Sequence, residues 1–186
     1  MKRIWIFLFA IIVMASFSCQ NAGEENKVAT ESGQQAPLTG QSGVVDDVSQ
    51  KNIVQVAVGS PDHTTLVTAV KAAELVDALS NAGPFTVFAP TNEAFGKLPA
   101  GTVDDLLKPE KMEALQNILQ YHVTIAVFKA EDLKDGQVLG QVNGDNITIV
   151  MKDGKPTVNG ANILASIPAS NGLIHVIDQV LLPPAQ

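Results

Sequence analysis

The residue with the clearest potential for chemistry is Cys19, which is the only cysteine in the chain. It follows an uncharged apolar run over residues 4–17, and the chain begins with the basic residues Lys2 and Arg3. A basic start, an apolar run and small residues in this order are typical of a secretory signal peptide. The run is shorter than the roughly 20 residues that a membrane-spanning helix needs. We therefore expect residues 1–18 to direct export and then to be removed.

The residues that lead into Cys19 indicate a modification of its thiol. The stretch Ser16, Phe17, Ser18, Cys19 resembles the lipobox of bacterial lipoproteins, although an aliphatic residue is more usual where Ser16 stands. This resemblance implies acylation of Cys19, and several acyl chains on one residue give stable anchoring to a membrane. The alternative is an unmodified thiol beside an ordinary cleavage site. An intramolecular disulfide is excluded because the chain has no second cysteine.

The other chemistry-bearing side chains do not form a known catalytic or metal-binding pattern. The histidines, His63, His122 and His175, lie far apart and lack the short spacing of zinc motifs. The serines include none in a Gly-x-Ser-x-Gly nucleophile elbow, and the glycines form no phosphate-binding loop. The sequence therefore predicts no catalytic residue, no metal and no cofactor, and the protein is not expected to be an enzyme.

The charge balance argues against nucleic acid as a partner. The whole chain has 12 basic and 19 acidic residues, for a net charge of −7. Removal of Lys2 and Arg3 with the signal peptide leaves 10 basic residues against 19 acidic ones, or −9. Binding to phosphate backbones depends on clustered lysines and arginines, and here the basic residues are scattered.

Composition divides the exported chain into a tether and one domain. Residues 19–46 start with the expected lipidated cysteine and are rich in Gly, Ser, Gln, Glu and Asn, which predicts a flexible linker. As a random coil, about 25 such residues would hold a domain roughly 25 to 30 Å from the anchor. Residues 47–184 suffice for a single domain with a core that needs no disulfides.

Helical periodicity dominates the first half of this domain, and strand patterns dominate the second. Helices are expected over residues 52–58, over residues 66–76 with Thr64 or Thr65 as the N-cap, and over residues 110–120. Strands are expected over residues 85–89 and 123–128, around Ile147 to Met151, and over residues 173–182, with the last one central in the sheet. Thr91 is interpreted as the N-cap of a short helix rather than as part of a polar binding loop.

Three sequence blocks together identify a family resemblance. Residues 85–95 read Phe-Thr-Val-Phe-Ala-Pro-Thr-Asn-Glu-Ala-Phe, residues 121–123 read Tyr-His-Val, and residues 171–178 read Asn-Gly-Leu-Ile-His-Val-Ile-Asp, followed by Val-Leu-Leu-Pro at 180–183. In order and spacing these blocks resemble the fasciclin domain. The resemblance implies an α+β fold, in which a wedge-like antiparallel sandwich of two β-sheets carries several short helices along one edge. It also implies adhesion or protein binding rather than catalysis.

Within the resemblance, Tyr121 and His122 are the candidate binding residues, because the Tyr-His pair of the family is linked to receptor contact. A structural role is the alternative for both. A histidine between an amphipathic helix and an apolar strand is commonly a neutral core residue. If Tyr121 instead contacts a partner, its hydroxyl is the group expected to be exposed. His175 and Asp178 lie three positions apart, on opposite faces of an ideal strand, and are not expected to pair.

Two functions remain open at this point. The first is a lipid-anchored module of the cell envelope that mediates adhesion or contact with an unidentified protein or matrix and associates weakly with itself. The outer membrane is the favoured membrane for its anchor, with the domain periplasmic or surface-exposed. The second is an accessory protein that binds a small molecule or glycan. Scarcity of aromatic residues counts against the second, because the only tryptophan would be lost with the signal peptide and, apart from Tyr121, a stacking platform for a sugar would have to come from phenylalanine.

Overall fold

The structure is a computed structural model, and it describes residues 50–184. Within these residues no helix has the length and apolar character needed to cross a membrane. The signal peptide, Cys19 and the tether fall in residues 1–49, outside the described residues, so the predictions for them remain predictions. The start of the domain at residue 47 lies outside them as well.

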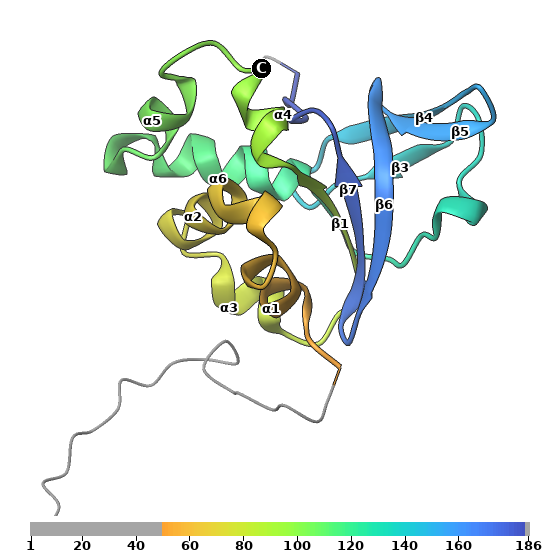
Figure 1. Cartoon of the computed structure of the whole chain (residues 1–186), viewed down its shortest axis with the longest axis horizontal. Helices are drawn as coiled ribbons and strands as arrows, with labels where there is room; N and C mark the ends of the chain where they lie inside the picture. The colour runs from red at the N-terminus through yellow and green to blue at the C-terminus, as the bar shows by residue number, and fades with distance from the viewer. Residues whose placement is uncertain (1–49, 185–186) are drawn as a thin grey trace, which may run out of the picture. The chain divides into compact units, whose positions relative to one another are not determined.

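The first half of the domain is a layer of short helices that packs on one side of the sheet (Figure 1). Single glycines, prolines and turns separate these helices, so none is longer than 10 residues. In chain order the elements are α1 (Ile53–Val58), η2 (Pro61–His63), α2 (Thr64–Ala72), α3 (Val76–Ser80), β1 (Phe85–Pro90), α4 (Asn92–Gly96), α5 (Thr102–Leu106), η3 (Pro109–Lys111) and α6 (Met112–Tyr121).

The second half consists mostly of strands. They are β2 (Val123–Thr124), β3 (Val138–Gly140), β4 (Asn146–Lys152), β5 (Lys155–Val158), β6 (Ala161–Ala169) and β7 (Gly172–Ile177), with the short helix η4 (Ala130–Asp132) before β3. The strands form one sheet in the order β2-β1-β7-β6-β5-β4-β3. A turn at Asp153 and Gly154, an Asp-Gly dipeptide of the kind that favours hairpins, joins β4 to β5, and both residues have the positive φ angles, 51° and 74°, that a tight hairpin turn requires.

The predicted α+β character is confirmed, but the antiparallel two-sheet wedge is not. β1 and β7 pair in parallel, with Phe85 beside Gly172 and Pro90 beside Ile177, while the other pairs are antiparallel. Both strands are buried on both faces, which is the usual situation of parallel strands, and the helices and remaining strands supply the long connection between them. β7 lies inside the sheet, as predicted, but the strand expected over residues 173–182 ends at Ile177.

The sheet curls until its two edge strands meet. The Val142 amide just after β3 donates to the Val123 carbonyl of β2 at 2.8 Å. The Thr124 hydroxyl donates to the Gln141 side-chain carbonyl at 3.0 Å. These contacts make the sheet nearly a barrel, and we call the line along which β2 approaches residues 138–142 the seam.

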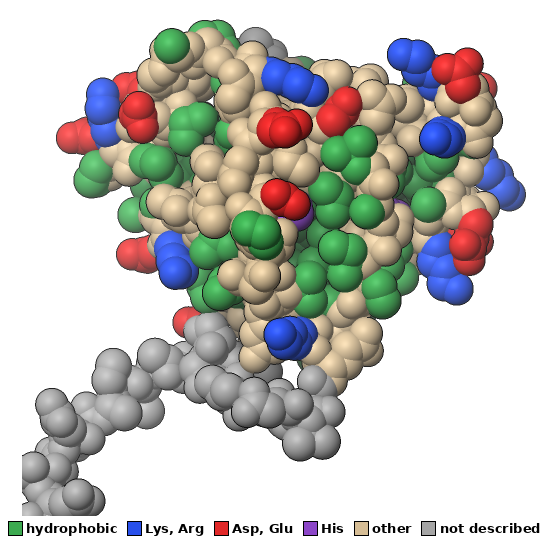
Figure 2. Space-filling view, viewed as in Figure 1, with side chains coloured by type: hydrophobic (Ala, Val, Ile, Leu, Met, Phe, Trp, Pro, Cys, Tyr) green, Lys and Arg blue, Asp and Glu red, His purple; other side chains and the backbone are tan. Residues whose placement is uncertain are grey.

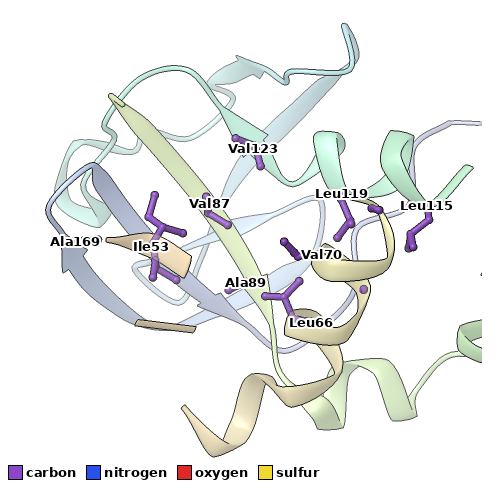
Figure 3. Packing of buried hydrophobic residues seen from close by; sticks show 12 residues of the cluster. Ile53, Leu66, Val70, Val87, Ala89, Leu115, Leu119, Val123 and Ala169 are labelled. Atoms are coloured by element: carbon purple, nitrogen blue, oxygen red, sulfur yellow. The ribbon is translucent and has the colours of Figure 1, made fainter. Parts of the chain in front are cut away.

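Because β1 and β7 are covered on both faces, the domain has two hydrophobic cores. On the helical face Val87 and Ala89 of β1 pack with Leu66, Val70 and Leu119 (Figure 3). On the barrel face Phe88, which is fully buried, packs with side chains such as Tyr121, Ile147, Ile149 and Ile177. Alternation along one strand therefore sends successive side chains into different cores.

The caps of the short helices are partly as the sequence predicts. The Thr91 hydroxyl accepts a hydrogen bond from the Ala94 amide at 3.2 Å, which confirms its role as an N-cap. The prediction that Thr64 or Thr65 caps α2 is wrong, because His63 occupies the cap position without a side-chain bond. The Asn92 side-chain carbonyl accepts from the Thr65 amide at 3.0 Å instead. Helix α2 is thus capped by a residue 27 positions away.

The strand expected over residues 123–128 is shorter in the structure, because β2 ends at Thr124. The chain then leaves the sheet, and the Thr86 side chain holds it. The Thr86 hydroxyl donates to the Ala126 carbonyl at 2.6 Å and accepts from the Phe128 amide at 2.9 Å. Over residues 126–128, hydrogen bonds to the Thr86 side chain thus take the place of backbone pairing with β1.

Candidate functional site

Tyr121 ends α6, and its side chain enters the barrel core with 2% of its surface exposed. The hydroxyl donates to the Asn146 carbonyl of β4 at 3.0 Å and accepts from the Asn159 side-chain amide at 2.8 Å. Both partners lie in the barrel, so Tyr121 fixes the end of α6 to strands that follow it by 25 residues or more. This is the arrangement expected for the structural interpretation, and the phenolic oxygen is not an exposed handle.

His122 directly precedes β2 and is also buried, at 3% exposure. Its Nδ1 lies 2.7 Å from the Ile118 carbonyl, which can only accept, so Nδ1 carries the hydrogen. Its Nε2 lies 3.0 Å from the Leu181 amide, which can only donate, so Nε2 is the acceptor. Burial lowers the pKa of His122 to about 4, against a weaker opposing effect of the hydrogen bond to Ile118. The ring is neutral at physiological pH and joins α6 to the segment after β7.

Tyr121 and His122 lie beneath the seam, so the surface along the seam is the part of the molecule that they support. The two segments that contain the sides of the seam and extend beyond it, 118–128 and 136–144, have no lysine, arginine, aspartate or glutamate. They carry four large apolar side chains that are more than 40% exposed, which we call the seam residues: Ile125, Val127, Val138 and Val142. On a protein with a net charge of −7, such a pair of uncharged segments is a candidate docking surface.

Buried polar side chains hold the seam residues in place from below. The Phe128 carbonyl accepts a hydrogen bond from Nε2 of His175 at 2.7 Å, and Nδ1 of that ring accepts from the Ser166 hydroxyl at 2.8 Å. Together with the two bonds of Thr86, this network fixes residues 126 and 128 on either side of Val127. Ile125 and Val127 therefore point outward from a restrained segment, so less conformational entropy is lost on binding.

His175 and Asp178 do not pair, as the sequence analysis expected. His175 is fully buried and stacks on Phe88, with 5.6 Å between ring centroids. Asp178 lies beyond the end of β7, and its carboxylate accepts from the backbone and side-chain amides of Asn162 at 2.8 Å each. Each residue is occupied by its own structural bonds.

The seam residues do not stand out individually in the sequence. Tyr121 and His122 follow from the family resemblance, and the structure places both beneath the seam rather than on it. The signal that could have found the seam is the absence of charge over residues 118–128 and 136–144. That signal gains meaning only once the two segments, separated by the seven residues 129–135, are known to meet.

The hollows inside the domain are small and apolar. One of about 50 Å³ lies between α1, α2 and β1, and another of about 30 Å³ lies between α2, α6 and the end of the chain. Pockets for drug-sized ligands are roughly 300 Å³ or more. In the part of the chain that the structure describes, no group of three or more His, Cys, Asp or Glu side chains converges. A protein-binding surface fits this geometry better than an internal ligand site does.

Comparison with known proteins agrees with the blocks seen in the sequence. The family model for the fasciclin domain matches residues 61–183. The chain is 54% identical over 137 residues to the protein sll1483 of Synechocystis sp. (strain ATCC 27184 / PCC 6803 / Kazusa). The match covers 73% of this chain and 76% of that protein. It is 33% identical to the transforming growth factor-beta-induced protein ig-h3 of Sus scrofa, over 99% of this chain but only 26% of that longer protein.

Among solved structures, a similar fold occurs in a FAS1 domain pair from the insect cell adhesion molecule Fasciclin I. The TM-score is 0.62 at 20% sequence identity, and the match covers 71% of this chain and 51% of that one. At this level of identity the likeness concerns the fold, and it agrees with the mixed sheet and helical layer described above.

Proposed function

The chain belongs to the fasciclin domain family, and from that premise we propose that it is an exported, lipid-anchored envelope protein whose domain binds other proteins at a cell surface or in a matrix. The observation that carries the binding role is the seam, where four exposed apolar residues lie on two uncharged segments. The lipid anchor rests on Cys19 and its signal-peptide context, and the role in adhesion rests on the family.

Three features support protein binding over small-molecule or glycan binding. The two cavities in the helical layer are too small for a metabolite, and a larger hollow of about 430 Å³ beside Val127 and Gly172 is wide open to solvent. The chain has one tyrosine, and its ring is buried with its hydroxyl already bonded. Residues 50–184 contain no tryptophan, so no large exposed ring is available there as a stacking platform for a sugar.

The anchor and the tether fit this role physically. A domain held roughly 25 to 30 Å from the membrane by a flexible linker can rotate and present any face to a partner. Anchoring also confines many copies to one surface, which raises their local concentration and strengthens weak contacts. A net charge of −9 after removal of residues 1–18 would keep such a protein soluble and away from nucleic acids.

The test uses cells in which the gene is deleted and then restored as single variants. Ile125→Lys places a charge on the seam at a side chain that is 67% exposed, so the fold should tolerate it. Val58→Lys makes the same change at the end of α1, at 57% exposure, on the helical side of the domain. We expect deletion and Ile125→Lys to reduce surface attachment or aggregation by a similar factor, and Val58→Lys to restore the wild-type level.

Two outcomes would count against the proposal. If deletion leaves attachment and aggregation unchanged under every growth condition, the role in adhesion is wrong. If deletion matters but Ile125→Lys behaves like Val58→Lys, adhesion stands and the seam is not its surface. Thermal unfolding of each variant separates loss of binding from loss of fold.

A further inference from the structure

Strand β6 is paired along only part of one side. It pairs with β7 over most of its length, but β5 pairs with it only at Ala161 and Asn162. The next pair in the β5 register would join Pro156 to Ile163, and a proline has no amide hydrogen to donate. The ladder stops there, so from Leu164 to Ala169 no described strand covers the outer side of β6.

The alternation of the β6–β7 ladder shows which backbone groups face the open side. Ala169 and Gly172 close a two-residue turn, and in such a hairpin the closing residues exchange hydrogen bonds with each other. Counting back from Ala169 in steps of two, Ile167 and Ala165 therefore direct their backbone groups toward β7. The amide and carbonyl of Ser166, and the carbonyl of Pro168, point outward.

This edge is exposed and carries no charge. Leu164 is 59% exposed, and Ala165, Ser166 and Pro168 are exposed as well. Residues 163–170 include no charged side chain, and Figure 2 shows hydrophobic side chains gathered over β6, with acidic side chains beside them and lysines farther out. Natural edges are commonly protected by charge, by prolines and by bulges. Here a register shift between Ile163 and Ala165 and the proline at 168 limit the edge at both ends and leave Ser166 between them.

We propose that this edge pairs in antiparallel fashion with the same edge of a second copy of the chain, with Ser166 opposite Ser166 of that copy. A two-fold axis at Ser166 makes the edge its own complement, because the amide of each Ser166 donates to the carbonyl of the other. Ala165 then faces Ile167 of the second copy, and no like charges oppose each other. The inference rests on the proposed function, and it names the partner of one surface of the interaction module.

The donors and acceptors favour a second copy over an unrelated strand. A longer guest strand would place its carbonyl opposite Pro168, where no amide hydrogen is available to meet it. In a pairing centred on Ser166, the outward amide and carbonyl of both Ser166 residues form hydrogen bonds. The pairing does not depend on further hydrogen bonds at Pro168. Two central hydrogen bonds make a weak contact, and confinement of many copies to one membrane raises the local concentration that such a contact needs.

Cross-linking through an introduced cysteine tests the register. In the full chain with Cys19→Ser, Ser166→Cys puts two thiols on directly opposite residues, whose Cβ atoms would lie about 4.5–5.5 Å apart. A short bismaleimide should then give a covalent dimer. Thr148→Cys, at an exposed position of β4, is the matched control and should remain monomeric. Thermal unfolding checks that loss of the Ser166 hydroxyl, which bonds His175, leaves the fold intact.

A second substitution in the same assay tests the edge itself. Leu164→Lys added to Ser166→Cys should lower the dimer yield at least about tenfold, since it places a charge on an edge that pairs with itself. Val58→Lys, at nearly equal exposure, should leave the yield unchanged. Three results would each overturn the inference. They are the absence of a Ser166 dimer at every protein concentration, an equal dimer yield from Thr148→Cys, and a monomer that binds an extended peptide along β6.

The outcome can be separated from that of the proposed function. If Leu164→Lys changes neither cross-linking nor attachment while Ile125→Lys abolishes attachment, self-pairing is wrong and protein binding at the seam stands. If Ser166 cross-links as expected but gene deletion leaves attachment unchanged, the pairing is real and the role in adhesion is wrong.

Discussion

At the scale of single residues, the buried histidines are structural groups whose neutrality the core enforces. Burial is the main cause that lowers the pKa of His63, His122 and His175. His122 and His175 use both ring nitrogens in hydrogen bonds, and each ring bonds a backbone carbonyl with one nitrogen. In His63, Nδ1 lies 2.7 Å from the Ser60 hydroxyl, and both Asp62 and the Ala89 backbone oppose the lowering of its pKa. These rings should make the fold sensitive to acid.

The first prediction concerns His122. Its pKa is about 4 in the folded protein and about 6.5 in the unfolded chain, so the unfolded state binds the proton more readily between these values. The resulting contribution, about 3 kcal/mol, is fully present above pH 6.5 and is lost as the pH falls toward 4. We expect the free energy of unfolding in urea to fall over this range, with His175 and His63 adding to the loss.

The variant His122→Gln isolates the effect of this ring. Glutamine can still donate and accept a hydrogen bond but does not titrate, so the slope between pH 4 and pH 6.5 should become shallower. At pH 7 the variant should be less stable by about 1–3 kcal/mol, since its bonds to Ile118 and Leu181 are disturbed. A slope equal to that of the wild type would show that His122 is not the group responsible.

At the scale of elements, the helices depend on contacts from outside themselves. Most have fewer than ten residues, and isolated helices of that length are marginal in water. The Asn92 side chain shows how this is solved, because it accepts from Thr64 and Thr65 at the start of α2 and donates to the Pro61 carbonyl at 2.9 Å. One side chain of α4 thereby fixes the start of α2 and the segment before it.

The second prediction compares two candidate caps of α2. Asn92→Ala removes these bonds and should lower the free energy of unfolding by about 1–2 kcal/mol. Thr65→Ala, at a residue that the sequence suggests as the cap, should change it by no more than about 0.5 kcal/mol. Urea denaturation with an unchanged m-value measures both. An equal cost for the two variants would mean that the cap assignment in the structure is wrong.

The third prediction concerns the junction between β1 and the β6–β7 hairpin, where two backbones meet closely. A Cβ atom on Gly83 would lie 1.9 Å from the Asn171 carbonyl oxygen, and backbone cannot move aside as a flexible side chain can. Gly83→Ala should therefore cost about 3 kcal/mol or prevent folding. Gly96→Ala, in α4 with open space around the new methyl group, is the control and should leave stability unchanged or raise it by up to about 1 kcal/mol. Similar melting temperatures for the two variants would contradict the geometry.

Local patterns predicted the individual elements well and their assembly less well. The strand over residues 85–89, the turn at Asp153 and the cap at Thr91 follow from nearby residues, and the structure confirms them. The parallel pairing of β1 with β7 joins segments about 80 residues apart, and no local pattern specifies such a partner. The same applies to Asn92 as the cap of α2 and to the seam, which depends on residues 123 and 142 meeting.

At the scale of the whole molecule, the domain is organised around two strands that are covered on both sides. Helices cover one face of β1 and β7, and the curled remainder of the sheet covers the other. This leaves two uncharged surfaces on an acidic protein: the seam residues, and the open edge of β6. Our two proposals assign a protein partner to the first surface and a second copy of the chain to the second.

The last prediction concerns the attachment of the whole molecule. The structure describes a domain over residues 50–184 with its own two cores, so the membrane contact is expected to depend on Cys19 alone. Cys19→Ser should move the protein from the membrane fraction to the soluble fraction and abolish labelling by a radioactive fatty acid. The melting temperature of the domain should remain the same, because residue 19 precedes the described domain by more than 30 positions. Cys19→Ser protein that stays in the membrane fraction, or wild-type protein that takes up no fatty acid, would contradict lipid anchoring while leaving the fold and its two surfaces unchanged.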